Sequence, residues 1–408
     1  MYSSIQQPEG FISPEEKLRT LSSQQFSSVP QPRTLGKLKK YLPIILGVFS
    51  ALFIGLFILT YVSANKEYEL LSPFVINKES ADSPVLTPMS ENPLNGMKSP
   101  MDQATEWINS RPIGVMINNH TEARPQSGLA DADLVYEIVA EGGITRYLAF
   151  FLSTLPEKIG PVRSTREYYL VLVKELGDAM IMHIGWSPQA LEAIETWPVR
   201  SLGRGGAQFW RDQARLDAGI AIEHTAYVNG KELRELGTTL GWEGKREFEH
   251  WKFKDDAKIN LNTEECKPAE CNMLTIDFWF KGDYTGMFKY DRATNSYLRF
   301  TGYDTEGNPV ALLDQESKKQ VAAKNVIVQY VSEVPIAGDD KSRLEYVLEG
   351  SGEAVIFRDG EAIKSIWKKE GRDLRTKYYD TNGNEILFNR GKIWVSIVPD
   401  RNINQVSY

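Results

Sequence analysis

Residues 160–195 read GPVRSTREYYLVLVKELGDAMIMHIGWSPQALEAIE, and this stretch decides the fold class of the region around it. A polar, glycine-led loop enters a helix of about a dozen residues that ends at Gly177. The run DAMIMH follows, with the length and apolar character of a buried strand. Ser187 can then cap a second helix, with Pro188 in the first turn, where its missing N–H costs no hydrogen bond. This alternation predicts an α/β fold.

The sequence on either side of this stretch also contains strand-like and helix-like runs. The run RPIGVMINN, which begins at Arg111, is typical of a buried strand whose end meets solvent. Further strands are expected over residues 134–139 and 146–152, and another helix over 230–240. We therefore predict an N-terminal α/β sheet domain over residues 111–255.

From about residue 270 onward the pattern of apolar residues and turn signals is different. Short strand-like runs such as MLTIDFWF, NVIVQYV and KIWVSIVP are separated by turn signals at Gly307-Asn308, Asp359-Gly360 and Asn382-Gly383. This pattern predicts a mostly antiparallel β domain over residues 270–408.

One segment is apolar enough to cross a membrane. Residues 42–62 read LPIILGVFSALFIGLFILTYV and carry no charge, which matches the length of about 20 residues that a spanning helix needs. Basic residues cluster before this run and nearly cancel after it, which places the N-terminus in the cytoplasm. We expect a disordered cytoplasmic tail (1–40), a transmembrane helix (41–62) and a flexible stalk (63–110).

Two other kinds of export signal could contain such an apolar run. A cleaved signal peptide is the alternative, but the apolar run is long for one and the tail before it is too long. A lipid anchor is excluded because no cysteine lies near the end of the run. The predicted location is therefore the cell membrane, with both globular regions on the extracytoplasmic side.

Charge and cysteine usage narrow the partners and the chemistry. The chain of 408 residues has a formal net charge of −7, which argues against a general nucleic-acid binder. The only two cysteines, Cys266 and Cys271, are close together and are expected to form a disulfide outside the membrane, since a zinc site would need two more ligands. With four histidines and no tight acidic cluster, neither a metal site nor a cofactor is expected.

Several segments, in order, carry a resemblance to a known family. They are NNHTEARPQSGLADADLVYE, EGGITRYLAFF, IGPVRSTREYY, GWSPQALEAI, FWRD and EHTAY, followed by NVIVQYV, GSGEAVIFRDG and GNEILFNRGKIWVSIVP. Over about residues 111–400 the chain resembles the YerB-like family of bacterial envelope proteins, which pair an N-terminal domain of unknown function with a smaller C-terminal domain. Members are often lipoproteins, so a transmembrane anchor here changes the attachment but not the compartment. The resemblance implies no established reaction.

The loop of residues 160–166 is the first candidate site. Arg163 and Arg166 carry forked donors suited to phosphate or carboxylate, and Ser164 lies between them. Backbone N–H groups at a helix start also favour anions. The alternative is that Ser164 or Thr165 caps the helix while the arginines pair with acids of the same region.

Histidines near strand ends are the second group of candidates. His183 follows the strand DAMIM directly, and in an open α/β sheet such positions line the usual ligand crevice. It could act as a general acid or base, or be a structural donor. Asn119, His120 and His224 are ligand-binding candidates of the same kind.

Charged residues around a predicted turn complete the set. Glu137 and Glu141 could work as an acid/base pair, or could neutralise nearby arginines, of which Arg124 and Arg146 are the closest in sequence. GxSxG, P-loop, HExxH and GxGxxG motifs are absent from the sequence.

Two functions remain open at this point. In the first, the protein is a non-catalytic module that binds an anionic cell-wall glycan or peptide through Arg124, Arg146, Arg163 and Arg166. In the second, it is an extracytoplasmic hydrolase or transferase acting on such a polymer, with His183 as the acid/base and Glu137 or Glu141 as its partner. The expected partners are the membrane and a cell-wall polymer or envelope protein.

Overall fold

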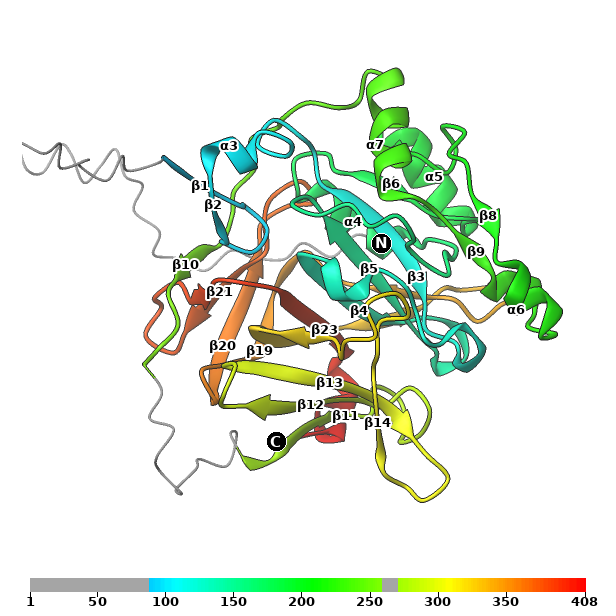
Figure 1. The fold of residues 1–408 in the computed structure, drawn as a ribbon. Coiled ribbons are helices and arrows are strands. Elements are labelled where there is room, and N and C mark those ends of the chain that lie inside the picture. The colour runs from blue at the N-terminus through cyan, green and yellow to red at the C-terminus, as the bar shows by residue number, and fades with distance from the viewer. Residues whose placement is uncertain (1–87, 259–270) are drawn as a thin grey trace, which may run out of the picture. The chain divides into compact units, whose positions relative to one another are not determined.

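A ten-stranded mixed sheet organises the protein (Figure 1), seen in a computed structural model that describes residues 88–258 and 271–408. In spatial order its strands are β21 (Lys377–Asp380), β20 (Glu361–Lys369), β19 (Gly350–Arg358), β16 (Asn325–Val331), β23 (Ile393–Pro399), β4 (Leu134–Val139), β5 (Thr145–Phe151), β3 (Ile113–Asn118), β6 (Met180–Met182) and β7 (Arg200–Ser201). The first five strands come from the C-terminal half of the chain and the last five from the N-terminal half. Both halves therefore share one sheet.

The junction between the halves is the parallel pairing of β23 with β4. Its register runs from Ile393 opposite Leu134 to Ile397 opposite Ile138. β16 also pairs with β23 in parallel, and all three strands are buried along their whole length. Strands buried on both faces read as continuous apolar runs, which is how NVIVQYV and IWVSIVP read here. The regions expected over 111–255 and 270–408 thus follow each other along the chain, but their central strands hydrogen-bond to each other.

A second, antiparallel sheet packs below the first in Figure 1. It consists of β14 (Pro309–Ala311), β13 (Ser296–Tyr303), β12 (Gly286–Asp291), β11 (Met273–Ile276) and β24 (Val406–Ser407), with β15 (Ala322–Ala323) paired to β13. Aromatic rings join the two sheets, with Phe288 edge-on to Trp394 at 5.9 Å and Tyr297 edge-on to Phe357 at 6.4 Å between ring centroids. The mostly antiparallel character predicted for the C-terminal region is confirmed.

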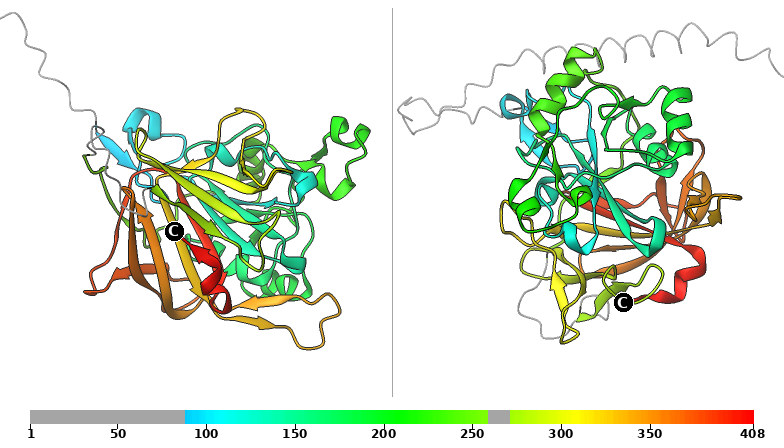
Figure 2. Two further views of the ribbon diagram at one scale, coloured as in Figure 1. Left: turned by 90° about the horizontal axis from the view of Figure 1, so that it is seen from below. Right: turned by 90° about the vertical axis from the view of Figure 1, so that its right-hand side faces the viewer.

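The longer helices belong to the N-terminal half and gather on its side of the molecule (Figure 2). They are α4 (Glu167–Lys174), α5 (Pro188–Thr196) and α7 (Gly230–Thr239), with the short α3 (Met101–Ala104) and α6 (Gln213–Asp217). The predicted cap of α5 is confirmed, because the Ser187 hydroxyl accepts a hydrogen bond from Ala190 N at 3.2 Å. The first predicted helix is shorter than expected. Its N-cap residue is Arg166, without a side-chain cap, so neither Ser164 nor Thr165 caps it.

Four two-stranded pairings complete the described structure. They are β1 (Met89–Glu91) with β2 (Lys98–Pro100), β8 (Trp210–Arg211) with β9 (Ala226–Tyr227), β10 (Lys252–Lys254) with β22 (Leu387–Asn389), and β17 (Glu333–Pro335) with β18 (Leu344–Tyr346).

Residues 88–110 were expected to belong to a flexible stalk, and that expectation was wrong. Leu94, Ala104 and Trp107 are buried in the core, and the amides of Asn92 and Asn95 donate to the buried carboxylate of Asp133 at 3.0 and 2.7 Å. The proline- and serine-rich composition concealed these few anchoring side chains.

The tail expected over 1–40 and the transmembrane helix expected over 41–62 lie outside the described residues. Among the helices that are described, none has the length and apolar character needed to cross a bilayer. Cys271 is disulfide-bonded, as predicted, and its expected partner Cys266 also lies outside the described residues.

Two buried ion-pair groups join the halves, one on each face of the large sheet. On one face Glu137 and Arg299, both fully buried, form a bidentate pair at 2.8 and 2.9 Å. On the other face the buried Glu175 accepts from Tyr136 at 2.7 Å and from Lys369 at 2.9 Å, and also pairs with Arg375. Burial alone would raise the pKa of Glu175, but these cations outweigh it and lower the pKa to about 2.

Breaking the first pair should destabilise the fold. Arg299→Met would leave the Glu137 carboxylate buried without a counter-charge, so we expect the free energy of unfolding to fall by about 3–5 kcal/mol. Urea unfolding followed by circular dichroism measures this. Lys245→Met, in an exposed pair with Glu247, is the control and should change stability by less than about 1 kcal/mol. Equal effects of the two changes would contradict the role assigned to Arg299.

Candidate functional site

The loop of residues 160–166 lies between β3 and the segment that follows β6. The backbone N–H of Arg163 donates to Met116 O at 2.9 Å on one side, and its carbonyl accepts from Ile184 N at 3.1 Å on the other. The loop is thereby held like an additional strand, and its side chains emerge where β3 and β6 end.

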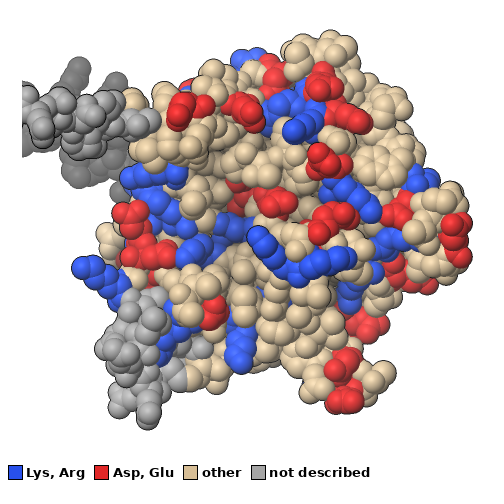
Figure 3. Space-filling view, in the orientation of Figure 1, with Lys and Arg blue, Asp and Glu red and all other residues tan. Residues whose placement is uncertain are grey.

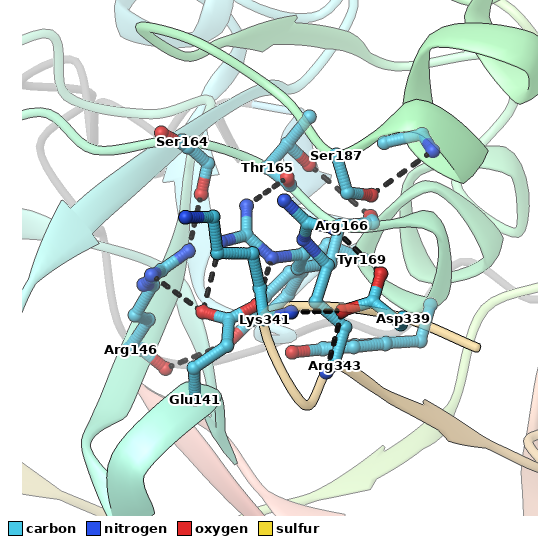
Figure 4. Close-up of polar contacts among 12 residues, drawn as sticks. Glu141, Arg146, Ser164, Thr165, Arg166, Tyr169, Ser187, Asp339, Lys341 and Arg343 are labelled. Carbon is cyan, nitrogen blue, oxygen red and sulfur yellow. Dashed lines mark hydrogen bonds and ion pairs between the residues drawn. The ribbon is translucent and has the colours of Figure 1, made fainter. Parts of the chain in front are cut away.

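Glu141 brings two of the predicted arginines together (Figure 4). It follows β4 in a turn where Gly142 and Gly143 have φ angles of 70° and 74°, values that favour glycine. Its carboxylate accepts from Arg166 Nε at 2.5 Å and Nη2 at 2.8 Å, and from Arg146 Nη2 at 3.0 Å. Burial would raise the pKa of Glu141, but the hydrogen bond from Arg166 and both cationic charges outweigh it and lower the pKa.

Arg163 adds a third guanidinium, and with Arg146 and Arg166 it forms what we call the arginine cluster. Within the described residues, no hydrogen bond or ion pair engages its side chain, which is half-buried. Burial lowers the pKa of Arg163. The charge of Glu223 acts against this lowering, and the charge of Arg166 adds to it. Because Glu223 is exposed, Glu141 is the only partly buried carboxylate that pairs with this cluster among the described residues. The cluster therefore holds more positive charge than its own partners neutralise.

The loop between β17 and β18 brings more basic groups to the same place. Lys341 and Arg343 extend toward the cluster in Figure 4, and Arg343 pairs with Asp339 at 2.6 Å. β18 packs against α4, with the rings of Tyr346 and Tyr168 4.9 Å apart. The face of the molecule seen in Figure 3 mixes acidic and basic side chains.

An exposed aromatic residue lies beside the loop of residues 160–166. Trp186 forms a β-bridge with Thr165, which lies inside the loop of residues 160–166, and its side chain is 41% exposed. The guanidinium of Arg204 lies 5.6 Å from its ring centroid. Large apolar rings at the surface beside polar groups are common in binding sites.

The predicted residues His120 and His224 meet at the end of β3. Their rings stack with centroids 4.4 Å apart, and Asn118 Nδ2 lies 2.7 Å from His224 Nδ1. Arg163 is near enough that its charge contributes to lowering the pKa of His224, after burial and the charge of His120. Glu122, which the sequence did not single out, completes a group of possible metal ligands whose donor atoms lie within 4.8 Å of one another.

His183 is in the place expected of it, but its surroundings do not fit an acid/base catalyst. It is 1% exposed, with Nδ1 2.9 Å from Gly185 O and Nε2 2.8 Å from Ser201 Oγ. Burial lowers its pKa to about 4, so the ring is neutral at physiological pH. With both nitrogens engaged inside the core, His183 is a structural residue.

Three other predicted residues face away from the arginine cluster. Glu137 is bonded to Arg299, Thr145 and Trp394 in the core, so Glu137 and Glu141 do not form an acid/base pair. Asn119 is fully buried and donates to Thr145 at 2.8 Å. Arg124 donates to Asn119 and to Asp283 O, beside the second sheet. Thr145 and Arg146 are neighbours in β5, so their side chains point to opposite faces of the large sheet. Glu137, which contacts Thr145, and Glu141, which contacts Arg146, therefore lie on different sides of the sheet.

Comparison with known proteins agrees with the resemblance noted in the sequence. Residues 99–243 and 274–395 match the N-terminal and C-terminal domains of the family described as "Protein of unknown function (DUF3048)". The chain belongs to this YerB-like family. "Putative lipoprotein YerB" of Bacillus subtilis (strain 168) is 33% identical over 322 residues, which cover 77% of this chain and 88% of the relative. The crystal structure of Bacillus subtilis YerB matches with a TM-score of 0.63 and 30% identity, over 78% of this chain and 99% of that one.

Sequence reasoning missed Lys341, Arg343 and Trp186. The two basic residues lie far downstream in a hairpin loop, and no local pattern connects them with the loop of residues 160–166. Trp186 directly precedes the N-cap Ser187, where a hydrophobic residue often packs on the first turns of a helix, so its position in the sequence did not indicate a site.

The buried, neutral state of His183 predicts a specific pH dependence of stability. Its folded pKa of about 4 lies below an unfolded value of about 6.5, so the unfolded state binds more protons between these values. The free energy of unfolding should therefore fall by about 3 kcal/mol as pH drops from about 6.5 to about 4. His183→Gln should remove this part of the slope in unfolding experiments at stepped pH, with His250→Gln at an exposed site as the control. An unchanged slope in His183→Gln would contradict the assignment.

Proposed function

We propose that this protein binds an anionic cell-envelope ligand, a glycan or a peptide, at the arginine cluster without chemically transforming it. The observation that carries the proposal is the sharing of one carboxylate, Glu141, by two guanidiniums while Arg163 has no side-chain partner within the described residues. Forked guanidinium donors suit phosphate and carboxylate oxygens. An incoming anion would supply the missing negative charge.

A position outside the cytoplasm is part of this proposal. The uncharged run of residues 42–62, with basic residues before it, supports a membrane anchor that leaves the folded unit on the extracytoplasmic side. The name of the Bacillus subtilis relative, a "putative lipoprotein", supports the same compartment by a different attachment. Cell-wall polymers with phosphate or carboxylate groups would then be within reach.

The exposed ring of Trp186 favours a glycan over a peptide. Sugar rings present flat C–H faces that stack on aromatic side chains, and Trp186 lies directly beside the loop that holds Arg163. A polymer with alternating sugar and anionic groups would satisfy both features at once.

The alternative, a hydrolase or transferase that uses His183, has less support. His183 is enclosed by Gly185 and Ser201, and Glu137 is engaged by Arg299. Neither group can reach a polymer at the surface without the core opening.

Arg163 gives the sharpest test, because its removal breaks no ion pair of the described structure. Full-length protein in detergent would be incubated with purified cell-wall fragments that keep or lack their anionic polymers, and binding and product release would both be followed. We expect Arg163→Ala to weaken binding on the order of tenfold, since hydrogen bonds from charged donors contribute about 1.5–3 kcal/mol. The control is Arg372→Ala, which should bind like wild type. Arg372 pairs with Asp373, which in turn lies 3.6 Å from Lys174 at the C-terminal end of α4. Equal binding by Arg163→Ala, or turnover of the polymer, would reject the proposal.

Trp186→Ala separates the two ligand classes. If a glycan is the ligand, loss of the ring should weaken binding of the fragments about five- to tenfold, corresponding to about 1–1.5 kcal/mol for one aromatic contact. Exposed Phe209→Ala is the control for removing a surface aromatic. Unchanged affinity in Trp186→Ala, with Arg163→Ala still defective, would point to a peptide or a free anion.

A further inference from the structure

The stacked histidines at the end of β3 form a defined arrangement of polar groups. Their planes are within 7° of parallel. His120 is half-buried at the start of η2 (Thr121–Ala123), and His224 is buried at the end of η5 (Ile222–His224). In each ring, Nδ1 is already hydrogen-bonded to a neighbouring group of the protein. Only Nε2 of each ring is then left to contact a ligand.

Neighbouring groups determine the proton positions on both rings. Asn118 Oδ1 accepts from His120 N at 3.0 Å, so its amide nitrogen is the atom that donates to His224 Nδ1. The backbone N–H of Glu122 donates to His120 Nδ1 at 3.3 Å. Each Nδ1 is therefore an acceptor, and in the neutral ring the proton is on Nε2. The pair presents two Nε2–H donors.

This arrangement is unfavourable for a metal ion, although Glu122 lies close by. A metal-binding histidine needs a free lone pair on the ligating nitrogen and usually donates its other N–H to an acceptor, whereas Nδ1 is already an acceptor in both rings. A bound zinc ion also lies about 2.0–2.1 Å from each nitrogen and near the ring plane, which two parallel rings 4.4 Å apart cannot both satisfy.

We propose that the Nε2–H groups of His120 and His224, together with Arg163, form a phosphate subsite of the anion-binding site. The proposal rests on the proposed function and specifies its ligand as a phosphate-bearing polymer. The donors come from β3's end, from η5 and from the loop of residues 160–166. A tetrahedral phosphate can accept from three such directions, whereas the two oxygens of a carboxylate lie in one plane.

Two exposed carboxylates face this subsite and would compete with the anion. Glu122 Oε2 lies 3.7 Å from His224 Nε2 with its side chain 48% exposed, and Glu223 acts on both His224 and Arg163. A bound phosphate would take the place of Glu122 beside His224. Neutralising Glu122 should therefore strengthen phosphate binding, but it would weaken the binding of a metal ion.

Calorimetric titration of the full-length protein in detergent with inorganic phosphate tests the subsite. We expect His120→Ala and His224→Ala each to weaken phosphate binding on the order of tenfold, and Glu122→Gln to strengthen it severalfold. His250→Ala at an exposed site is the matched control. His120 is only half-buried, so its variant keeps the test valid if His224→Ala does not fold.

The outcomes separate this inference from the function on which it rests. Unchanged phosphate affinity in both histidine variants, or weaker binding in Glu122→Gln, would overturn the subsite. So would stoichiometric Zn²⁺ binding that His224→Ala and Glu122→Gln both abolish. If Arg163→Ala loses cell-wall fragments while the histidine variants keep phosphate affinity, the proposed function stands and the subsite falls. If wild type binds phosphate through the histidines but no fragments, the subsite stands and the envelope ligand is wrong.

Discussion

The fold depends on the burial of Glu137 against Arg299. These residues lie 162 positions apart, and their bidentate pair is fully enclosed between the two sheets. The guanidinium also lies over the rings of Phe288 and Trp394, at 4.8 and 5.1 Å from their centroids. A buried carboxylate without its partner is strongly unfavourable, so the second sheet must dock where Arg299 can reach β4. The pair thus specifies how the halves combine more than it adds stability.

The large sheet then separates structural from functional polar groups. Residues of β5 alternate between its faces, so Thr145 serves the Glu137 network and Arg146 serves Glu141 on the other side. On the first face the Glu137–Arg299 pair is fully enclosed. On the second, Glu141 remains partly accessible, with 23% of its side chain exposed. The difference in enclosure makes one glutamate a structural anchor and the other part of a candidate site.

Local structure was predictable from the sequence, and long-range pairing was not. The cap at Ser187 involves neighbours in the chain, so the sequence contains all that is needed to predict it. The pairing of β4 with β23 joins two apolar runs that could equally have been central strands of separate sheets. His183 was located correctly at the end of a strand, but its role depends on burial and on Ser201, which sequence alone does not reveal. Arg146 and Arg166 meet at Glu141, and Arg163 lies within range of the charge of Arg166, but their use as one binding site stays a prediction. Arg124 lies apart from them, because its guanidinium donates to Asn119 and to Asp283 O.

The arginine cluster also explains why a protein would keep unbalanced charge in a half-buried place. Arg146 and Arg166 each feel the other's charge, and burial together with this repulsion lowers the pKa of Arg146. Replacing Arg163 with an apolar residue would relieve part of the repulsion without breaking an ion pair of the described residues, and stability alone would favour that change. The unfavourable charge is balanced only in part by Glu141, and a bound anion would complete the balance. The Glu175 group also places two cations on one carboxylate, but it is fully enclosed. Around Glu141, in contrast, the carboxylate is partly accessible and Arg163 adds a third cation, and this accessible excess of charge is the pattern expected of a binding site rather than of a structural network.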